Sequence, residues 1–267
     1  MSRRAMTIVV AVVAVAAVLW IVRDAVTENS TADGAPASAG ASVAKTPWGE
    51  PDLSGVWKGE IVGARDGRDT FNLTTLEGLY TADARARMKQ LSAKDDPALQ
   101  CAPLAFPRAA MLGQPLQIIQ SPGFTFVFTQ AYPAVRIIPT TGRPHTAEQY
   151  LFPSHLGDST AHWDGDTLVI DVISFNGESW LASAEDRPTN ASTAIWLTSP
   201  AMHIVERWRR IDADTLEYQA TVADPQTLTM PWETPRMTFK RQPADRIEEA
   251  LCRPEDGPET YLARLRS

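Results

Sequence analysis

The sequence predicts a mainly β domain, an antiparallel β-barrel with a β-sandwich as the alternative. One short surface helix and an N-terminal membrane-anchor helix complete the predicted fold. Strand-like segments follow one another at near-regular spacing from residue 117 onward, with turn residues between them. The chain holds 20 prolines and 15 glycines, which interrupt it too often for long helices. An apolar run near the N-terminus has no polar face and is typical of a membrane helix.

Residues 1–26 form that first element. Arg3 and Arg4 precede the apolar run 6–22, which is long for a signal-peptide core and just long enough to span a membrane. The nearest small-x-small patterns, at 35–39, lie too far downstream for signal peptidase, which favours an uncleaved signal anchor over a cleaved signal peptide. The two arginines orient the N-terminus toward the cytoplasm. We therefore expect an inner membrane anchor with the domain in the periplasm, the alternative being secretion to the periplasm after cleavage.

Residues 27–45 are small and polar, which predicts a flexible tether. The remainder, 46–267, is expected to form a single β-rich periplasmic domain of about 220 residues. A net charge of −7 without a clustered basic stripe excludes a general nucleic-acid binder. Two cysteines in an exported domain, Cys101 and Cys252, predict a disulfide between the middle and the end of the chain.

The folded domain opens with Gly55-Val56-Trp57 at the head of a first strand. This G-x-W pattern resembles the start of lipocalin-like barrels, in which the tryptophan closes one end of the barrel. A helix is predicted over 81–91, with Thr81 as its N-cap and Asp83 in its first turn. It is expected to lie on the surface of the sheet.

Strands are expected at 117–120, 124–130, 134–139, 166–175, 201–211, 215–222 and 236–241. Asp164-Gly165 is a two-residue turn signal before one of them, because both residue types tolerate positive φ. The short turn 212–214 predicts an antiparallel hairpin between its two flanking strands.

Asp171 lies inside the strand 166–175, which is apolar on both faces and is therefore expected to be covered on both sides. A carboxylate there must be paired, hydrogen-bonded or protonated. We expect Asp171 to be buried and to face a cavity shared with at least one of His155, His203 and Arg136. The alternative is a purely structural hydrogen bond or ion pair.

Glu206 shares the more apolar face of its strand with Ile204 and Trp208, so it is expected to point inward, while His203 lies on the other face. One interpretation is structural, a pair between Glu206 and an inward arginine such as Arg136. The other is functional, with Asp171, His155, His203 and Glu206 as acid–base candidates in an aromatic cavity. The predicted substrate-binding residues of that cavity are Arg136, Tyr132, Asn176, Trp180 and Trp208.

The four histidines include no pair with the spacing of a metal motif, so neither a metal nor a cofactor is predicted. Gly157-Asp158-Ser159 is similar to the nucleophile turn of hydrolases. That turn must lie between a strand and a helix, whereas Ser159 precedes a predicted hairpin strand, and we interpret it as a turn residue.

Several stretches together resemble a group of exported bacterial proteins of unassigned function, numerous in acidobacteria and proteobacteria. They are TPWGEPDLSGVW, QCAPLAFPR, TTGRPH, the block from WDGDTLVIDVISFN to GESW, HIVERWRRIDADTLEY, DPQTLTMPWE and a terminal cysteine. The resemblance covers most of residues 46–252 and implies export and one β-rich domain. The chain departs from the pattern at 186–200, where DRPTNASTAIWLTSP replaces a shorter link that contains a histidine.

The function expected from these residues is binding of a small apolar or aromatic molecule in the barrel, followed by cofactor-independent acid–base chemistry of lyase or isomerase type. The first alternative is a non-catalytic periplasmic carrier or sensor that uses the same cavity. The second is a structural envelope protein with a filled core. The interior of the barrel distinguishes these three functions. A cavity with at least two convergent titratable groups favours the enzyme, a purely apolar cavity favours the carrier or sensor, and the absence of a cavity favours the structural protein.

Overall fold

The computed structural model describes residues 44–59, 73–146, 148, 151–183, 195–248 and 252. The predicted anchor at 1–26 and nearly all of the predicted tether lie outside these residues. Within the described ranges, no helix combines the length and apolar character needed to cross a membrane.

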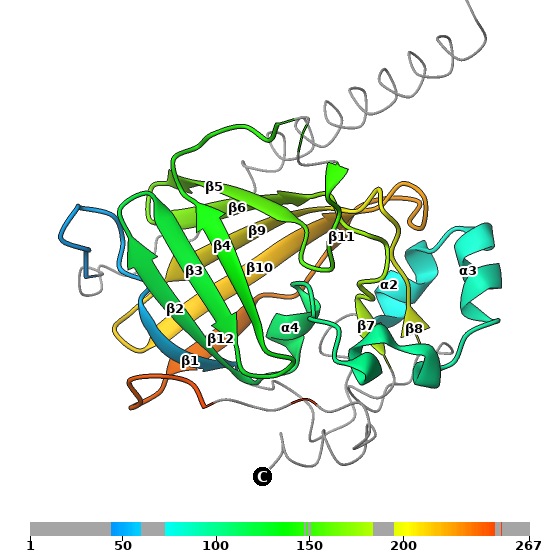
Figure 1. Cartoon of the computed structure of the whole chain (residues 1–267), viewed down its shortest axis with the longest axis horizontal. Helices are drawn as coiled ribbons and strands as arrows, with labels where there is room; N and C mark the ends of the chain where they lie inside the picture. Colours follow the sequence, from blue (N-terminus) through cyan, green and yellow to red (C-terminus); the bar gives the residue numbers. More distant parts are fainter. Residues whose placement is uncertain are drawn as a thin grey trace, which may run out of the picture. The chain divides into compact units, whose positions relative to one another are not determined.

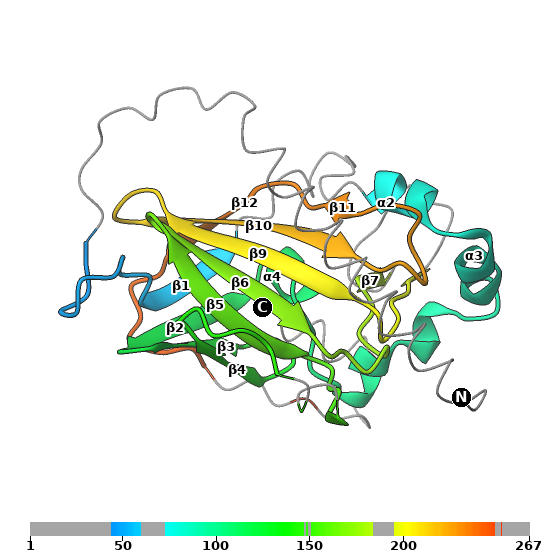
Figure 2. The same ribbon diagram turned by 90° about the horizontal axis from the view of Figure 1, so that it is seen from above.

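One antiparallel sheet of ten strands curves into a nearly closed barrel (Figures 1 and 2). The short strand β11 (Trp232–Glu233) pairs with β10 beside the main path of nine strands. Their order in the sheet is β4-β3-β2-β1-β12-β10-β9-β6-β5. The strands are β1 (Gly55–Gly59), β2 (Pro115–Ser121), β3 (Phe124–Thr129), β4 (Ala134–Pro139), β5 (Asp158–Asp164), β6 (Thr167–Ile173), β9 (His203–Arg210), β10 (Thr215–Ala223) and β12 (Met237–Arg241). The predicted antiparallel barrel is confirmed, and the sandwich alternative is wrong. The narrower likeness to lipocalins stays a prediction.

The smaller elements gather at one end of the barrel (Figures 1 and 2). They are α2 (Leu73–Leu79), α3 (Ala82–Met88), η2 (Ala93–Asp95), η3 (Pro97–Gln100), α4 (Arg108–Met111), the pair β7 (Ala182–Ser183) and β8 (Ile195–Trp196), and β11 (Trp232–Glu233). The predicted helix is α3, and Thr81 caps it by accepting a hydrogen bond from the Ala84 N–H at 3.2 Å. The sequence did not predict α2, α4 or the pair β7–β8.

Both predicted turns join neighbouring strands. In the hairpin β5–β6, Asp164 pairs with Thr167, so the two central residues are Gly165 and Asp166, one position later than expected. Gly165 has φ +58°, a backbone conformation that glycine adopts without steric cost. β9 and β10 pair along their length, as predicted from the turn at 212–214.

Alternating side chains of the strands fill the barrel with large rings. Trp208, Tyr218 and Phe239 are fully buried and contact one another, with ring centroids 4.5 and 5.6 Å from that of Trp208. Toward the β9–β10 turn, the guanidinium groups of Arg210 and Arg241 lie 5.7 and 5.0 Å from the ring of the buried Trp57.

At the opposite end, α4 lies between the curved halves of the sheet (Figure 2). Gly59, at the end of β1, makes this position possible. A Cβ atom at Gly59 would come within 3.0 Å of the Gly113 Cα, just after α4. The short helix therefore closes this end of the barrel from inside, and the side chains of Ala110 and Met111 join the core.

The edge strands β4 and β5 lie beside each other, but no hydrogen-bonded ladder joins them within the described ranges. We call the boundary between these two edge strands the seam, and two hydrogen bonds cross it. The backbone N–H of Gly142, just after β4, donates to the carbonyl of Ala161 on β5 at 2.9 Å. The Arg136 guanidinium on β4 donates to the Ser159 hydroxyl on β5 at 3.0 Å.

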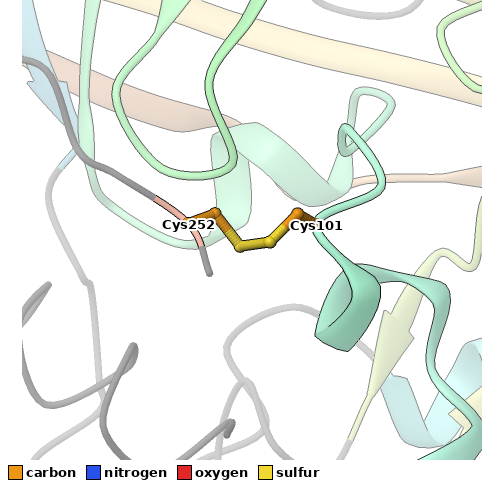
Figure 3. Close-up of a disulfide and its surroundings, with 2 residues drawn as sticks. All are labelled: Cys101 and Cys252. Atoms are coloured by element: carbon orange, nitrogen blue, oxygen red, sulfur yellow. A yellow bond between two sulfur atoms is a disulfide. The ribbon is translucent and has the colours of Figure 1, made fainter. Parts of the chain in front are cut away.

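The predicted disulfide between Cys101 and Cys252 is confirmed (Figure 3). The two Cα atoms are 5.7 Å apart, and the residues are 151 positions apart in sequence. Cys101 ends η3, six residues before Pro107 and α4. The bond thus ties the segment that leads into the barrel end to the last described residue of the chain.

Reduction of this disulfide should lower the free energy of unfolding by about 3–5 kcal/mol, because the bond closes a long loop and restricts the unfolded chain. Urea unfolding with and without reductant measures the difference. The double variant Cys101→Ser/Cys252→Ser is the control and should be as stable as the reduced protein and insensitive to reductant. Equal stability of the oxidised and reduced wild-type protein would contradict the prediction.

Candidate functional site

Arg136 and Glu206 form an ion pair inside the barrel. The guanidinium donates two hydrogen bonds to the carboxylate, Nη2 to Oε1 at 2.7 Å and Nη1 to Oε2 at 3.1 Å. Both side chains are buried. The indole N–H of Trp208 also donates to Oε2, at 3.1 Å. The inward orientation of Glu206 and its pairing with Arg136 are confirmed, and we name these two residues the interior ion pair.

Tyr218 lies on the neighbouring strand β10, opposite Trp208. Burial raises the pKa of its phenol well above the ordinary 10.0, the negative charge of Glu206 raises it further, and the positive charge of Arg136 lowers it in part. Tyr218 is therefore a neutral hydrogen-bond donor at every physiological pH. Inside the barrel, the titratable groups Arg136, Glu206 and Tyr218 thus converge among aromatic rings.

Asp171 lies on the outer face of the barrel, because it pairs with Val205, the residue before the inward Glu206 on β9. Its side chain is 41% exposed, so the expectation that Asp171 is buried is wrong. Its neighbours on that face, Val169 and Ile173, are buried as the apolar pattern predicts. The cover is incomplete at the carboxylate, which remains partly in solvent and is paired.

Two imidazoles share the carboxylate of Asp171. His203 Nε2 lies 3.0 and 3.1 Å from its two oxygens, and His145 Nε2 lies 2.8 Å from Oδ1. The other ring nitrogen of His145, Nδ1, lies 3.1 Å from Asp158 Oδ2. We call His145, Asp158, Asp171 and His203 the imidazole–carboxylate cluster.

The charges in this cluster shift the pKa values of two groups in opposite directions. Burial acts to raise the pKa of Asp171, but the hydrogen bonds and positive charges of the two histidines outweigh it and hold that pKa well below the ordinary 3.8. Burial acts to lower the pKa of His145, but hydrogen bonds and charges of Asp171 and Asp158 outweigh it and raise that pKa above 6.5. The cluster therefore combines a carboxylate whose ionised form is favoured with a histidine whose protonated form is favoured.

His145 was not among the predicted site residues. It stands in the connection between β4 and β5, and only the path of that connection across the outer face brings it to Asp171. The sequence contains one indirect signal, the turn residue Gly142 three positions earlier, which with φ +69° bonds to β5 and directs the chain toward the cluster.

His155 does not contact Asp171, although the sequence suggested them as acid–base partners. Its Nε2 lies 3.7 Å from Glu178 Oε2, and its buried Nδ1 has no hydrogen-bond partner among the described residues. Asn176 binds the same Glu178, with its side-chain oxygen accepting from the Glu178 N–H at 2.9 Å. His155 and Asn176 therefore form a group with Glu178 that is separate from the imidazole–carboxylate cluster.

The remaining predicted site residues are also dispersed. Trp208 lies inside the barrel beside Glu206, and Trp180 packs in the main core. Tyr132 belongs to a small cluster with Ala98, Leu104, Leu112 and Ala131. Ser159 is an inward strand residue, not a turn residue, and its hydroxyl accepts from Arg136. The single polar patch expected from the sequence is therefore two sites on opposite faces of β6 and β9.

No known family model matches the chain, and no curated protein is significantly similar to it. In the described part of the chain, no group of three or more His, Cys, Asp or Glu side chains is arranged to hold a metal ion.

The cluster should make stability depend on pH. Because the pKa of His145 is raised on folding, its contribution is complete below the ordinary 6.5 and is lost as pH rises through the raised value. His145→Gln should therefore lower the free energy of unfolding by about 1 kcal/mol near pH 5.5 and by less near pH 9. Urea unfolding at the two pH values tests this, and an equal loss at both would contradict it.

Removal of one partner of the interior ion pair should lower the free energy of unfolding strongly, whereas replacement of both partners by apolar residues should lower it little. Glu206→Leu leaves Arg136 buried without a counter-charge and should lower the free energy of unfolding by about 3–5 kcal/mol. The double variant Arg136→Met/Glu206→Leu should recover most of that loss, because it removes both buried charges. Calorimetry of the single and double variants measures this, and a double variant less stable than Glu206→Leu would contradict it.

Proposed function

We propose that the protein is a cofactor-independent acid–base enzyme of lyase or isomerase type, with the imidazole–carboxylate cluster as its catalytic centre. The observation that carries the proposal is the half-exposed carboxylate of Asp171 held between two imidazoles. Reactions of this type remove a proton from one atom of a substrate and return one to another, so they need a base and an acid close together.

His203 suits the role of base. Its Nε2 lies against Asp171, so in a neutral imidazole the Nε2–H donates to the carboxylate and the lone pair is on Nδ1. That Nδ1 atom has no partner among the described residues. His145 suits the role of acid or electrostatic stabiliser, because carboxylates on both ring nitrogens favour its protonated form. Environments that differ in this way separate the two roles of chemically identical side chains.

A small apolar or aromatic substrate is supported by two side chains of the β4–β5 connection, which also carries His145. Leu151 and Phe152 are 69% and 81% exposed. Large exposed apolar side chains beside polar groups are typical of binding surfaces. We further propose that the domain works in the periplasm on an N-terminal membrane anchor and does not bind nucleic acid. The disulfide supports an oxidising compartment.

The second candidate is a carrier or sensor that binds its ligand without converting it. The aromatic interior of the barrel, with the interior ion pair and Tyr218, favours this alternative. Conversion of a bound compound, and its dependence on Asp171, distinguishes the enzyme from the carrier.

Asp171→Asn should abolish conversion while leaving the fold intact, because it keeps the shape of the side chain but removes the charge that holds both imidazoles. Incubation of the full-length protein with a bacterial metabolite extract, followed by mass spectrometry of bound and converted species, measures both properties. Loss of turnover should reach at least about 100-fold, the range of a positioned acid–base group.

His162→Gln is the matched control, because His162 is exposed on the same outer face of β5 and belongs to neither site. It should convert the same compounds as the wild-type protein. Compounds that are bound but never converted by the wild-type protein would contradict the enzyme and favour the carrier.

A further inference from the structure

Two of the buried donors that lack acceptors lie beside the interior ion pair. The Tyr218 hydroxyl and the Arg136 Nε–H have no hydrogen-bond partner among the described residues, although both side chains are almost completely buried. They come from different strands, β10 and β4, and both face Glu206 closely enough that its charge acts on them. Buried donors without acceptors are rare and costly in folded proteins, which suggests that something else binds here.

Phe106 lies on this polar centre. Its ring centroid is 4.9 Å from the Arg136 guanidinium carbon, 5.6 Å from the Trp208 ring and 5.9 Å from the Tyr218 ring. The Phe106 ring thus lies where an aromatic ligand would be bound, in contact with one cation and two aromatic side chains. A phenylalanine, however, offers no acceptor to either donor.

Phe106 does not belong to the sheet. It precedes α4 in a segment that enters the barrel end, and two contacts hold this segment. Cys101 is tied to Cys252, and Arg108 of α4 donates from Nη1 to Asp96 Oδ1 at 3.0 Å within a buried ion pair. Because Cys101 and Arg108 are held in place, movement of the residues between them would withdraw the Phe106 ring without unfolding the barrel.

We propose that the barrel interior beneath Phe106 is a binding site for an uncharged aromatic molecule that carries a hydrogen-bond acceptor such as a carbonyl oxygen. The ring of the ligand replaces that of Phe106 against Arg136, Trp208 and Tyr218. Its oxygen accepts from the Tyr218 hydroxyl and the Arg136 Nε–H. Segment 101–107 acts as the gate.

The charge balance of the site selects for uncharged ligands. The single positive charge of Arg136 is already compensated by Glu206 through two hydrogen bonds. A carboxylate ligand would bring an unpaired negative charge into the apolar interior beside Glu206, which is strongly unfavourable. This inference concerns the inner face of the sheet and does not depend on the acid–base function proposed for the outer face.

Three probes of similar size test the proposal, namely acetophenone with a ring and a carbonyl, ethylbenzene with a ring alone, and benzoate with a charge. Isothermal titration of the full-length protein should give saturable binding of acetophenone, at least about tenfold weaker binding of ethylbenzene and none of benzoate. Tyr218→Phe should weaken acetophenone binding about tenfold and leave ethylbenzene binding unchanged.

Phe106→Ala should strengthen acetophenone binding several-fold, because the ligand no longer has to displace the native ring. If Phe106→Ala fails to fold, the titrations of the wild-type protein and of Tyr218→Phe still decide the proposal. The proposal is overturned if the wild-type protein does not bind acetophenone at millimolar concentration, or if Tyr218→Phe binds it as tightly as the wild-type protein does. Unchanged turnover in Tyr218→Phe would leave the acid–base function standing in either case.

Discussion

The barrel depends on the interior ion pair between Arg136 and Glu206. No ladder joins β4 and β5, and apart from the backbone bond from Gly142 to Ala161 the two edge strands are linked by a side chain. Arg136 on β4 reaches both Ser159 on β5 and Glu206 on β9. Burial of two charges is expensive, and only good geometry offsets the cost. Here the carboxylate receives two bonds from the guanidinium and a third from the Trp208 indole. Arg136 thus helps to hold the seam and, together with Glu206, gives the interior its chemical character.

The pleat of β9 explains why the protein carries two polar sites and not one. His203 and Glu206 are three positions apart on this strand, so they point to opposite faces. The outer face offers solvent access and groups that can exchange protons. The inner face offers aromatic walls, an ion pair of zero net charge and two donors without acceptors. The two proposals, conversion of a substrate at the outer face and enclosure of a ligand at the inner face, therefore rest on separate groups of residues.

The sequence predicted what depends on local chemistry and missed what depends on chain path. The strand 134–139, the cap at Thr81 and the inward Glu206 follow from alternation and capping. The disulfide follows from the presence of two cysteines in a domain expected to be exported. α4 has only four residues, too few for a periodic signal. α2 is as long as the predicted α3 but has no acidic residue in its first turn to mark its start. The apolar neighbours of Asp171 predict that it is buried. How far this residue is covered depends, however, on the connection between β4 and β5, which is distant in sequence. The same connection brings in His145, which no strand pattern could reveal.

The central claim is that one ionised carboxylate holds two histidines at the outer face. Titration of the imidazole signals by nuclear magnetic resonance, in the wild-type protein and in Asp171→Asn, tests it most directly. In the wild-type protein, the pKa of His145 should lie above 6.5, and it should fall in the variant, because Asp171 supplies a hydrogen bond and a charge to its ring. The same pKa of His145 in both proteins would contradict the shared carboxylate and the acid–base centre built on it.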